Sequence, residues 1–406
     1  MNEILSIMGK YLSVIILLLL SLSSSTVVAQ QQSQTVQPED GVIIESPVIS
    51  LLTCSPGSEL YSAWGHSALR VRYPELGADM VFNFGLFDFN TPNFYVKFVR
   101  GQLKYMLGIQ DIRDFIASYE WEGRAIVEQK LNLTVEQKSE IIARLDYLYK
   151  PENRYYYYSF LYKNCTSELR DLIFAYTNVS DEFLNRESGE TFRDLLNIYT
   201  SGWARFGINI MLGSPIDKRV TMFQRMFLPD NLMSGFSEVV MPEGNLVAWE
   251  KTIIAANQSA KKGLTISDLF RPEVVCSLIL ILVLLSLFYF KRIEALVKKS
   301  LFAIFGFAGL FIIVVTIFSE HVEIYYNLNL LWMNPLLLIP AFMSGKKCIR
   351  LYLISLLCLF LSMVALVIIW FTGIQYAEPG FIIIAIALTA LIIKACDDNR
   401  RQTECR

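Results

Sequence analysis

Cysteine and histidine, two residue types that together catalyse acyl transfer through a thiolate, are scarce in this chain. Between residues 30 and 270 the sequence contains two cysteines, Cys54 and Cys165, and one histidine, His66. In the stretch YKNCTSELRDLI, Cys165 stands at the start of a predicted helix, where unpaired N–H groups and the positive end of the dipole favour a thiolate. An imidazole within hydrogen-bond reach would take the thiol proton. Cys165 and His66 are therefore our candidate nucleophile and general base.

A cysteine–histidine site needs further groups that orient the imidazole and stabilise developing charge. Asn83, on the predicted strand that follows His66, is our first candidate for orienting the far ring nitrogen, and Asp88 is the second. Backbone N–H groups near Cys165 would bind the oxyanion. The sequence has no recognisable zinc-ligand spacing and no glycine-rich phosphate loop, so we expect no metal and no organic cofactor.

A disulfide is the alternative interpretation of the two cysteines. In an oxidising compartment Cys54 and Cys165 could simply form a bridge, and His66 could be a structural residue at the end of a strand. A histidine beside a glycine at a strand, together with a cysteine at a helix start, favours the catalytic interpretation.

Hydrophobic periodicity predicts the elements that must hold these residues. Strands are expected in the stretches 41–57, 67–73 and 79–89. Amphipathic helices are expected at 134–151 and 166–176, the first of them ended by Pro151. Because strands come first and helices follow, we predict an α+β domain over residues 45–270.

The two ends of the chain differ sharply from this domain in hydropathy. Of the 406 residues 53% are hydrophobic, with a mean hydropathy of +0.40, and the excess lies in the C-terminal third. At the N-terminus, Lys10, an apolar run and Val28-Ala29 predict a signal peptide over residues 1–29, cleaved after Ala29. A flexible leader, residues 30–44, follows. The net charge of −2 does not favour nucleic acid as a partner.

Residues 271–396 form a predicted membrane domain of about five helices. The expected spans are 274–290, 301–318, 328–343, 351–373 and 379–394. Lysine and arginine gather in the connections 291–300 and 344–350 and in the tail 397–406, and are absent from 319–327 and 374–378. This asymmetry predicts a cytoplasmic C-terminal tail, with the soluble domain on the outer face of the inner membrane.

A second polar cluster lies in the stretch FSEHVEIYYNLNLLWMNPLL, predicted to be on the same side of the membrane as the soluble domain. Polar residues at the end of a span are costly unless they are solvated or used. They could line a lipid head-group or amine site beneath Cys165; the members of this cluster are Glu320, His321, Glu323, Asn327, Asn329 and Trp332. The alternative is an interfacial loop whose Tyr325, Tyr326 and Trp332 form an aromatic belt.

The motif WGHSALRV, followed by YKNCTSEL with 99 positions between His66 and Cys165, resembles the circularly permuted papain-like and lecithin–retinol acyltransferase-like enzymes. Over residues 45–395 the chain resembles more closely the bacterial lipoprotein N-acyltransferases with a periplasmic His/Cys domain followed by several membrane spans (Lnb-type). The likeness rests on GHSALRV, NFGLFDF, YKNCTSELRDLI, MFLPDNLM and NLNLLWMNPLLL.

This resemblance implies a fold and an activity. The fold would be a permuted papain-like periplasmic domain followed by an all-α membrane domain in the bacterial inner membrane. The activity would be transfer of a fatty acyl group from a membrane phospholipid to the N-terminal amine of a diacylated lipoprotein through a thioester. Carried over by position, Cys165 would be the nucleophile and His66 the base.

Two other classes of function stay open at this point. One is a membrane-tethered periplasmic hydrolase of the papain-like group, either a peptidase or a lipid deacylase. The other is a membrane-anchored binding module with a structural disulfide and no catalytic activity.

Overall fold

The computed structural model describes residues 46–255, 270–343 and 349–404. The predicted signal peptide, residues 1–29, and the predicted leader, residues 30–44, lie outside the described residues.

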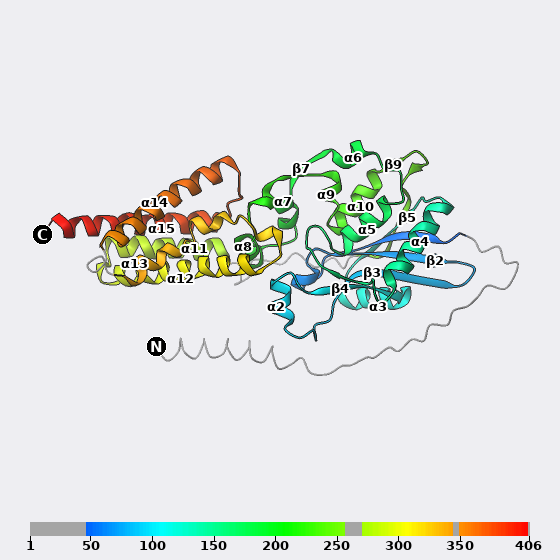
Figure 1. Ribbon diagram of the computed structural model, residues 1–406, viewed down its shortest axis with the longest axis horizontal. Helices are drawn as coiled ribbons and strands as arrows, with labels where there is room; N and C mark the ends of the chain where they lie inside the picture. Colours follow the sequence, from blue (N-terminus) through cyan, green and yellow to red (C-terminus); the bar gives the residue numbers. More distant parts are fainter. Residues whose placement is uncertain (1–45, 256–269, 344–348, 405–406) are drawn as a thin grey trace. The chain divides into compact units, whose positions relative to one another are not determined.

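The soluble part is built on a seven-stranded antiparallel sheet (Figure 1). In spatial order its strands are β11 (Val247–Ile254), β5 (Ile126–Leu131), β1 (Val48–Cys54), β2 (His66–Tyr73), β3 (Ala78–Leu86), β4 (Lys104–Asp111) and β6 (Tyr155–Tyr157). The three strands predicted from sequence are β1, β2 and β3, which lie side by side in this sheet. The catalytic candidates His66 and Asn83 therefore come from adjacent strands.

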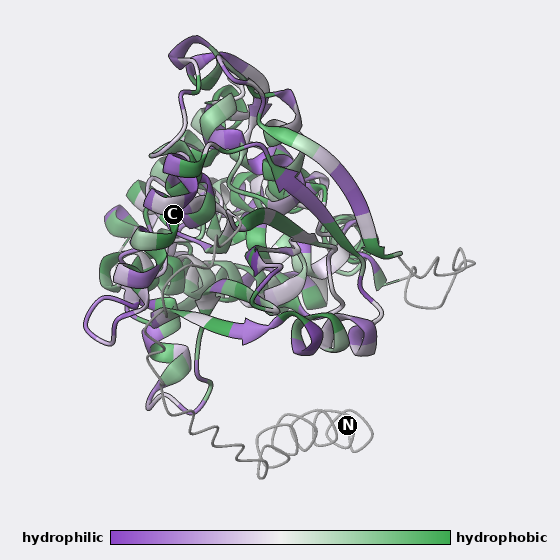
Figure 2. Ribbon diagram, turned by 90° about the vertical axis from the view of Figure 1, so that its right-hand side faces the viewer, coloured by the Kyte–Doolittle hydropathy of each residue, from purple (hydrophilic) through white to green (hydrophobic). Residues whose placement is uncertain are grey.

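Helices cover both faces of the sheet, which explains why β1 is buried from Ile49 to Cys54. Ile49 and Leu51 belong to a core formed with α4 (Val135–Tyr149), α5 (Cys165–Phe174) and α10 (Pro229–Glu238). Leu52 and Cys54 alternate with them and pack on the opposite side with α3 (Ile112–Glu122). The surrounding helices carry both hydrophobic and hydrophilic segments (Figure 2), as amphipathic helices do.

The helices predicted around the candidate cysteine are confirmed. The helix expected at 134–151 is α4, which begins with a capping box between Thr134 and Gln137 and ends before Pro151. The helix expected at 166–176 is α5. The remaining elements of the soluble part are η1 (Leu60–Ser62), α2 (Phe94–Val99), α6 (Asp181–Asn185), β7 (Glu187–Thr191), α7 (Phe192–Asn197), α8 (Gly202–Met211), η2 (Ser214–Asp217), β8 (Arg219–Thr221), α9 (Met222–Arg225), β9 (Val240–Met241) and β10 (Gly244–Asn245).

The C-terminal part is helical. Its long helices are α11 (Pro272–Phe288), α12 (Lys291–Phe318), α14 (Ile349–Thr372) and α15 (Pro379–Glu404). Within the described ranges three segments are long and apolar enough to cross a membrane, namely Ile293–Phe318, Ile349–Thr372 and Pro379–Asn399. Helix α11, predicted as the first span, has 17 residues and is shorter than these. Helix α15 continues as far as Glu404, through most of the predicted tail.

The segment 328–343, predicted as the third span, does not form one helix, so the prediction of a single helix there is wrong. It is divided into η5 (Leu328–Leu331), η6 (Pro335–Leu337) and α13 (Leu338–Phe342), preceded by η4 (Val322–Ile324). The Asn334 side chain accepts from the N–H of Leu336 at 3.0 Å and starts a new turn there, while Pro335 has no N–H to continue the earlier one.

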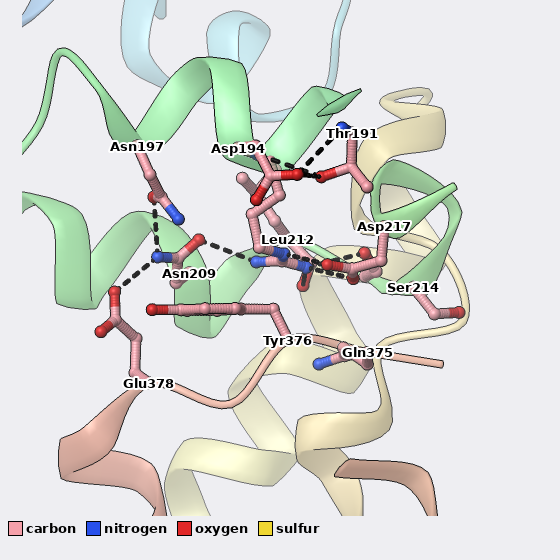
Figure 3. Close-up of polar contacts among 12 residues, drawn as sticks. Thr191, Asp194, Asn197, Asn209, Leu212, Ser214, Asp217, Gln375, Tyr376 and Glu378 are labelled. Carbon is pink, nitrogen blue, oxygen red and sulfur yellow. Dashed lines mark hydrogen bonds and ion pairs between the residues drawn. The ribbon is translucent and has the colours of Figure 1, made fainter. Parts of the chain in front are cut away.

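A buried polar network links α7 and α8 to the segment that leads into α15 (Figure 3). The Asn209 amide on α8 donates to Asn197 Oδ1 at 2.9 Å and to Glu378 Oε1 at 2.7 Å. Arg193 on α7 donates to Asn209 Oδ1 at 2.8 Å and pairs with Asp217 at 2.7 Å. Because each of these buried polar side chains has a partner, the network is a specific contact between the soluble part and the helical part.

Candidate active site

Cys165 is the first residue of α5, and the residue before it holds the helix start in place. The Asn164 side chain accepts hydrogen bonds from the N–H groups of Thr166 and Ser167 at 2.8 and 2.9 Å. Its amide nitrogen donates to the carbonyls of Phe160 and Phe227 at 2.7 and 3.0 Å. The cap does not use the N–H of Cys165, which stays beside the half-buried thiol.

His66, the first residue of β2, contacts both Cys165 and Asn83. Its Nε2 lies 2.6 Å from Asn83 Oδ1, so Nε2 carries the proton of the neutral ring and Nδ1 is left for the sulfur. The imidazole and the thiol of Cys165 lie close enough for each to shift the pKa of the other. The amide nitrogen of Asn83 in turn donates to Gln110 Oε1 at 3.2 Å on β4. The structure thus brings Cys165, His66 and Asn83 together as a connected chain of side chains.

Asp88, the second candidate for orienting His66, takes no part in this chain. It follows the end of β3, and its carboxylate accepts from the N–H of Asn90 at 2.8 Å. The neutral amide of Asn83 is the group that contacts the ring.

The electrostatic surroundings of Cys165 favour the thiolate. Burial raises the pKa of the thiol, but the charge of His66 and its hydrogen bond to the sulfur act in the opposite direction. The Ser67 N–H and the Thr166 hydroxyl add to that effect, so that the pKa of Cys165 falls from 9.0 to about 7. Burial lowers the pKa of His66, but the charge and hydrogen bond of Cys165 outweigh it, and the pKa of His66 is raised. Near neutral pH a thiolate–imidazolium pair is accessible.

The structure contradicts the disulfide alternative, because Cys54 and Cys165 are both free thiols. Cys54 is the cross-strand neighbour of His66 in the β1–β2 ladder, but its side chain is fully buried on the α3 side of the sheet. Burial raises the pKa of Cys54 to about 12, although a hydrogen bond with Tyr119 lowers it somewhat. Cys54 is therefore a core residue and Cys165 is the available thiol.

Gly85 is a residue that the search for chemical groups missed. The β3–β4 pairing is irregular between Asn83 and Leu86, and Gly85 there has φ +87°. A Cβ at this position would lie 3.3 Å from Cys165 Cβ and 3.8 Å from the Cys165 nitrogen. Glycine is required both by the left-handed backbone and by the approach to the thiol. A glycine inside the alternating stretch NFGLF is the sequence pattern that indicates such a bulge.

The predicted substrate cluster after α12 separates into two groups. The Asn327 amide donates to the backbone carbonyls of Ile210 and Met211, at the end of α8, at 2.8 and 3.0 Å. The Asn329 amide donates to the carbonyls of Asn209 and Ile210, both at 3.1 Å. Trp332 is fully buried in the core of the helical part and donates to Asn329 Oδ1 at 3.1 Å. These three side chains have structural partners and lie apart from the thiol site.

The other group of this cluster contacts the soluble part. His321 Nε2 lies 2.8 Å from the carbonyl oxygen of Phe98, and Glu320 accepts from the Gln102 amide at 2.7 Å. The buried Glu323 carboxylate accepts from the Leu161 N–H at 3.3 Å. The connection after α12 is therefore attached to the domain that carries Cys165.

Comparison with protein families follows the same division of the chain. The family model described as the Lnb N-terminal periplasmic domain matches residues 35–197, which include His66, Asn83 and Cys165. The model described as the Lnb transmembrane domain matches residues 265–396. Searches of curated proteins and of solved structures find no match. With both domains present, the chain is an Lnb-type membrane protein that has a periplasmic N-terminal domain and a transmembrane domain.

Proposed function

We propose that this protein is a lipoprotein N-acyltransferase with Cys165 as its nucleophile. It would move a fatty acyl chain from a membrane phospholipid to the N-terminal amine of a diacylglyceryl-cysteine lipoprotein. The observation that carries the proposal is the contact of the half-buried Cys165 thiol with His66, whose other nitrogen is held by Asn83 at 2.6 Å, in a chain with both Lnb domains.

In the first half-reaction the Cys165 thiolate attacks the ester carbonyl of the phospholipid. The carbonyl oxygen becomes an oxyanion, for which the N–H of Cys165 at the start of α5, which the Asn164 cap does not use, would be a donor. When the tetrahedral intermediate collapses, the imidazolium of His66 gives its proton to the leaving alkoxide. Lysophospholipid departs and the acyl chain remains on Cys165 as a thioester.

In the second half-reaction the neutral amine of the lipoprotein attacks the thioester. His66, now neutral, takes a proton from the nitrogen as the C–N bond forms, and the Cys165 thiolate leaves. This step makes the amide and regenerates the thiolate–imidazolium pair. Asn83 acts through His66, because it keeps the proton on Nε2 and the lone pair of Nδ1 towards the sulfur.

The proposal also includes a fold relation and a topology. The order of His66 before Cys165, on a strand and at a helix start respectively, supports a relation to the circularly permuted papain-like enzymes. The basic connections support a cytoplasmic C-terminal tail and about five membrane segments, among them α11 and the broken segment 328–343.

The test uses the full-length protein reconstituted with labelled phospholipid and a synthetic diacylated lipopeptide. We expect N-acylated lipopeptide and lysophospholipid in equal amounts, and an acyl adduct on the tryptic peptide that contains Cys165. Release of free fatty acid or of a cleaved peptide instead would identify a membrane-tethered hydrolase.

A further inference from the structure

A cavity of about 800 Å³ lies next to the candidate active site. One of the residues that line it is Leu86, which follows Gly85, the glycine that lies against Cys165. Four elements contribute the rest: the end of β3 and the loop after it, α2, β4 and β6, together with Glu320 from the connection after α12. Because Leu86 directly follows Gly85, whose backbone lies against Cys165, the cavity adjoins the part of β3 beside the thiol.

Charged groups of both signs face this cavity. Lys97 of α2 and Lys104 of β4 are the cations, and Asp88 and Glu320 are the anions. In the described part of the chain neither lysine lies within ion-pair distance of a carboxylate. The Lys104 ammonium lies 5.8 Å from the ring centre of Tyr157, which also lines the cavity. Two cations from separate elements thus face the cavity without an ion-pair partner among the described residues, and the two carboxylates make hydrogen bonds there to neutral groups only.

Helix α2 locates this cavity at the surface of the bilayer. None of its residues is buried, and the exposed fractions of Tyr95, Val96 and Phe98 are 68%, 58% and 48%. Such an apolar, unpartnered face on a short helix with Lys97 is typical of an element that lies in the membrane interface.

Hydrogen bonds attach the end of α2 to the end of a membrane span. The carbonyls of Val99 and Arg100 accept from the Ser319 hydroxyl at 2.7 Å and from the Glu320 N–H at 3.0 Å. Ser319 directly follows the span Ile293–Phe318. Because α12 leaves the bilayer at this point, α2 and the cavity beside it lie at the level of the lipid head groups.

We propose that this cavity binds the head group of a zwitterionic phospholipid that carries a phosphate and a primary ammonium. The phosphate lies against Lys97 and Lys104, and the ammonium lies towards Asp88 and Glu320. Equal numbers of cations and anions disfavour a ligand with a net charge. The glycerol ester is one short linker away from the phosphate, on the side of Leu86 and Cys165. This inference rests on the proposed function, since it names the acyl donor of that reaction.

Binding is tested apart from catalysis, with full-length Cys165→Ala protein in detergent and short-chain phospholipids with a phosphoethanolamine or a phosphoglycerol head group. We expect the phosphoethanolamine lipid to bind more tightly, and Lys97→Gln/Lys104→Gln to weaken its binding about tenfold. Asp88→Asn/Glu320→Gln should remove the preference between the two lipids. The matched control is Lys150→Gln/Lys251→Gln, two exposed lysines outside the cavity, which should leave binding unchanged.

Three outcomes would overturn the inference. The lysine variant and its control could bind the phosphoethanolamine lipid equally well, or the protein could prefer the phosphoglycerol lipid. The third outcome is that inorganic phosphate binds as tightly as the lipid, which would indicate a site for free phosphate. The acyl-transfer assay with unmodified Cys165 separates this inference from the proposed function. Head-group binding without acyl transfer would leave the cavity assignment intact and reject the acyltransferase. Acyl transfer without head-group binding in the cavity would reject only the cavity assignment.

Discussion

Cys54 and Cys165 lie in the same domain, and both are neighbours of His66, yet their surroundings give them opposite properties. Cys54 ends β1 opposite His66 in the strand ladder and is fully buried, and its pKa is raised to about 12. Cys165 opens α5, is half-buried, and has a pKa lowered to about 7. A thiol is therefore not activated merely because its residue pairs with a histidine in the neighbouring strand.

The difference lies in which groups the two sulfurs meet. The Cys54 side chain packs among Phe115, Tyr119 and Ile126, where burial is the largest influence on its ionisation. The Cys165 sulfur meets the imidazole itself, together with donors from Ser67 and Thr166. Four experiments can break or sharpen this contrast.

The largest effect is expected when each thiol is removed. Cys165→Ala should lower acyl transfer by about 10⁴-fold or more, because the nucleophile is lost. Cys54→Ala should leave the rate within about twofold and only reduce stability, by about 1–3 kcal/mol for a buried side chain. Rates of N-acylated lipopeptide formation and thermal unfolding measure the two effects. Comparable losses of rate in both variants would end the distinction.

The pH dependence of alkylation should separate the two thiols next. With a pKa of about 7, Cys165 is about half ionised at pH 7. A thiol with the ordinary pKa of 9.0 would be ionised to about one part in a hundred at the same pH. The reaction of Cys165 with iodoacetamide should therefore rise at lower pH than that of an ordinary thiol, and Cys54 should stay unlabelled. His66→Ala should move the Cys165 midpoint upwards. Peptide mass spectrometry assigns each label, and an unmoved midpoint would contradict the pairing.

Asn83 should matter through His66 and less than the pair itself. Asn83→Ala removes the acceptor of the Nε2 proton, and we expect acyl transfer to fall about 10- to 100-fold. Because the hydrogen bond to Asn83 also raises the pKa of His66, the variant should lower the pH at which the imidazolium is lost. A purely structural role would reduce the rate without this change in the pH profile. Asn178→Ala, which removes an exposed amide that contacts Glu243 and not the ring, is the control for the profile.

The smallest effect is expected at the backbone beside the thiol. Gly85→Ala combines a left-handed φ of +87° with a Cβ at 3.3 Å from Cys165 Cβ, so acyl transfer should fall about tenfold. Gly77→Ala is the matched control, because Gly77 also has a positive φ, +63°, but open space around the added carbon. Both variants should lose a similar amount of stability, about 1 kcal/mol. Equal rates of acyl transfer in the two variants would show that the close approach of Gly85 to Cys165 does not contribute to the reaction.

Part of the fold and of the site could be predicted because the relevant rules are local. Alternation in 67–73 and 79–89 predicts β2 and β3, and the helical periodicity of 166–176 predicts α5. The prediction of one continuous helix over 328–343 was wrong because average hydropathy does not register that Asn334 and Pro335 start a new turn. Asn327 and Asn329 were predicted as substrate ligands, but no local rule indicates that the carbonyls of α8 lie opposite them.

Residue types and spacing were enough to single out Cys165 and His66, because residues 30–270 contain one histidine and two cysteines and helix starts follow local capping rules. Tertiary packing decided which of two thiols meets the imidazole, which side chain holds its far nitrogen, and that Leu86 lines one cavity with Lys97 and Lys104. The physical reason is that ionisation and hydrogen bonding depend on distances of a few ångströms between segments separated by many residues, and only the folded chain determines those distances.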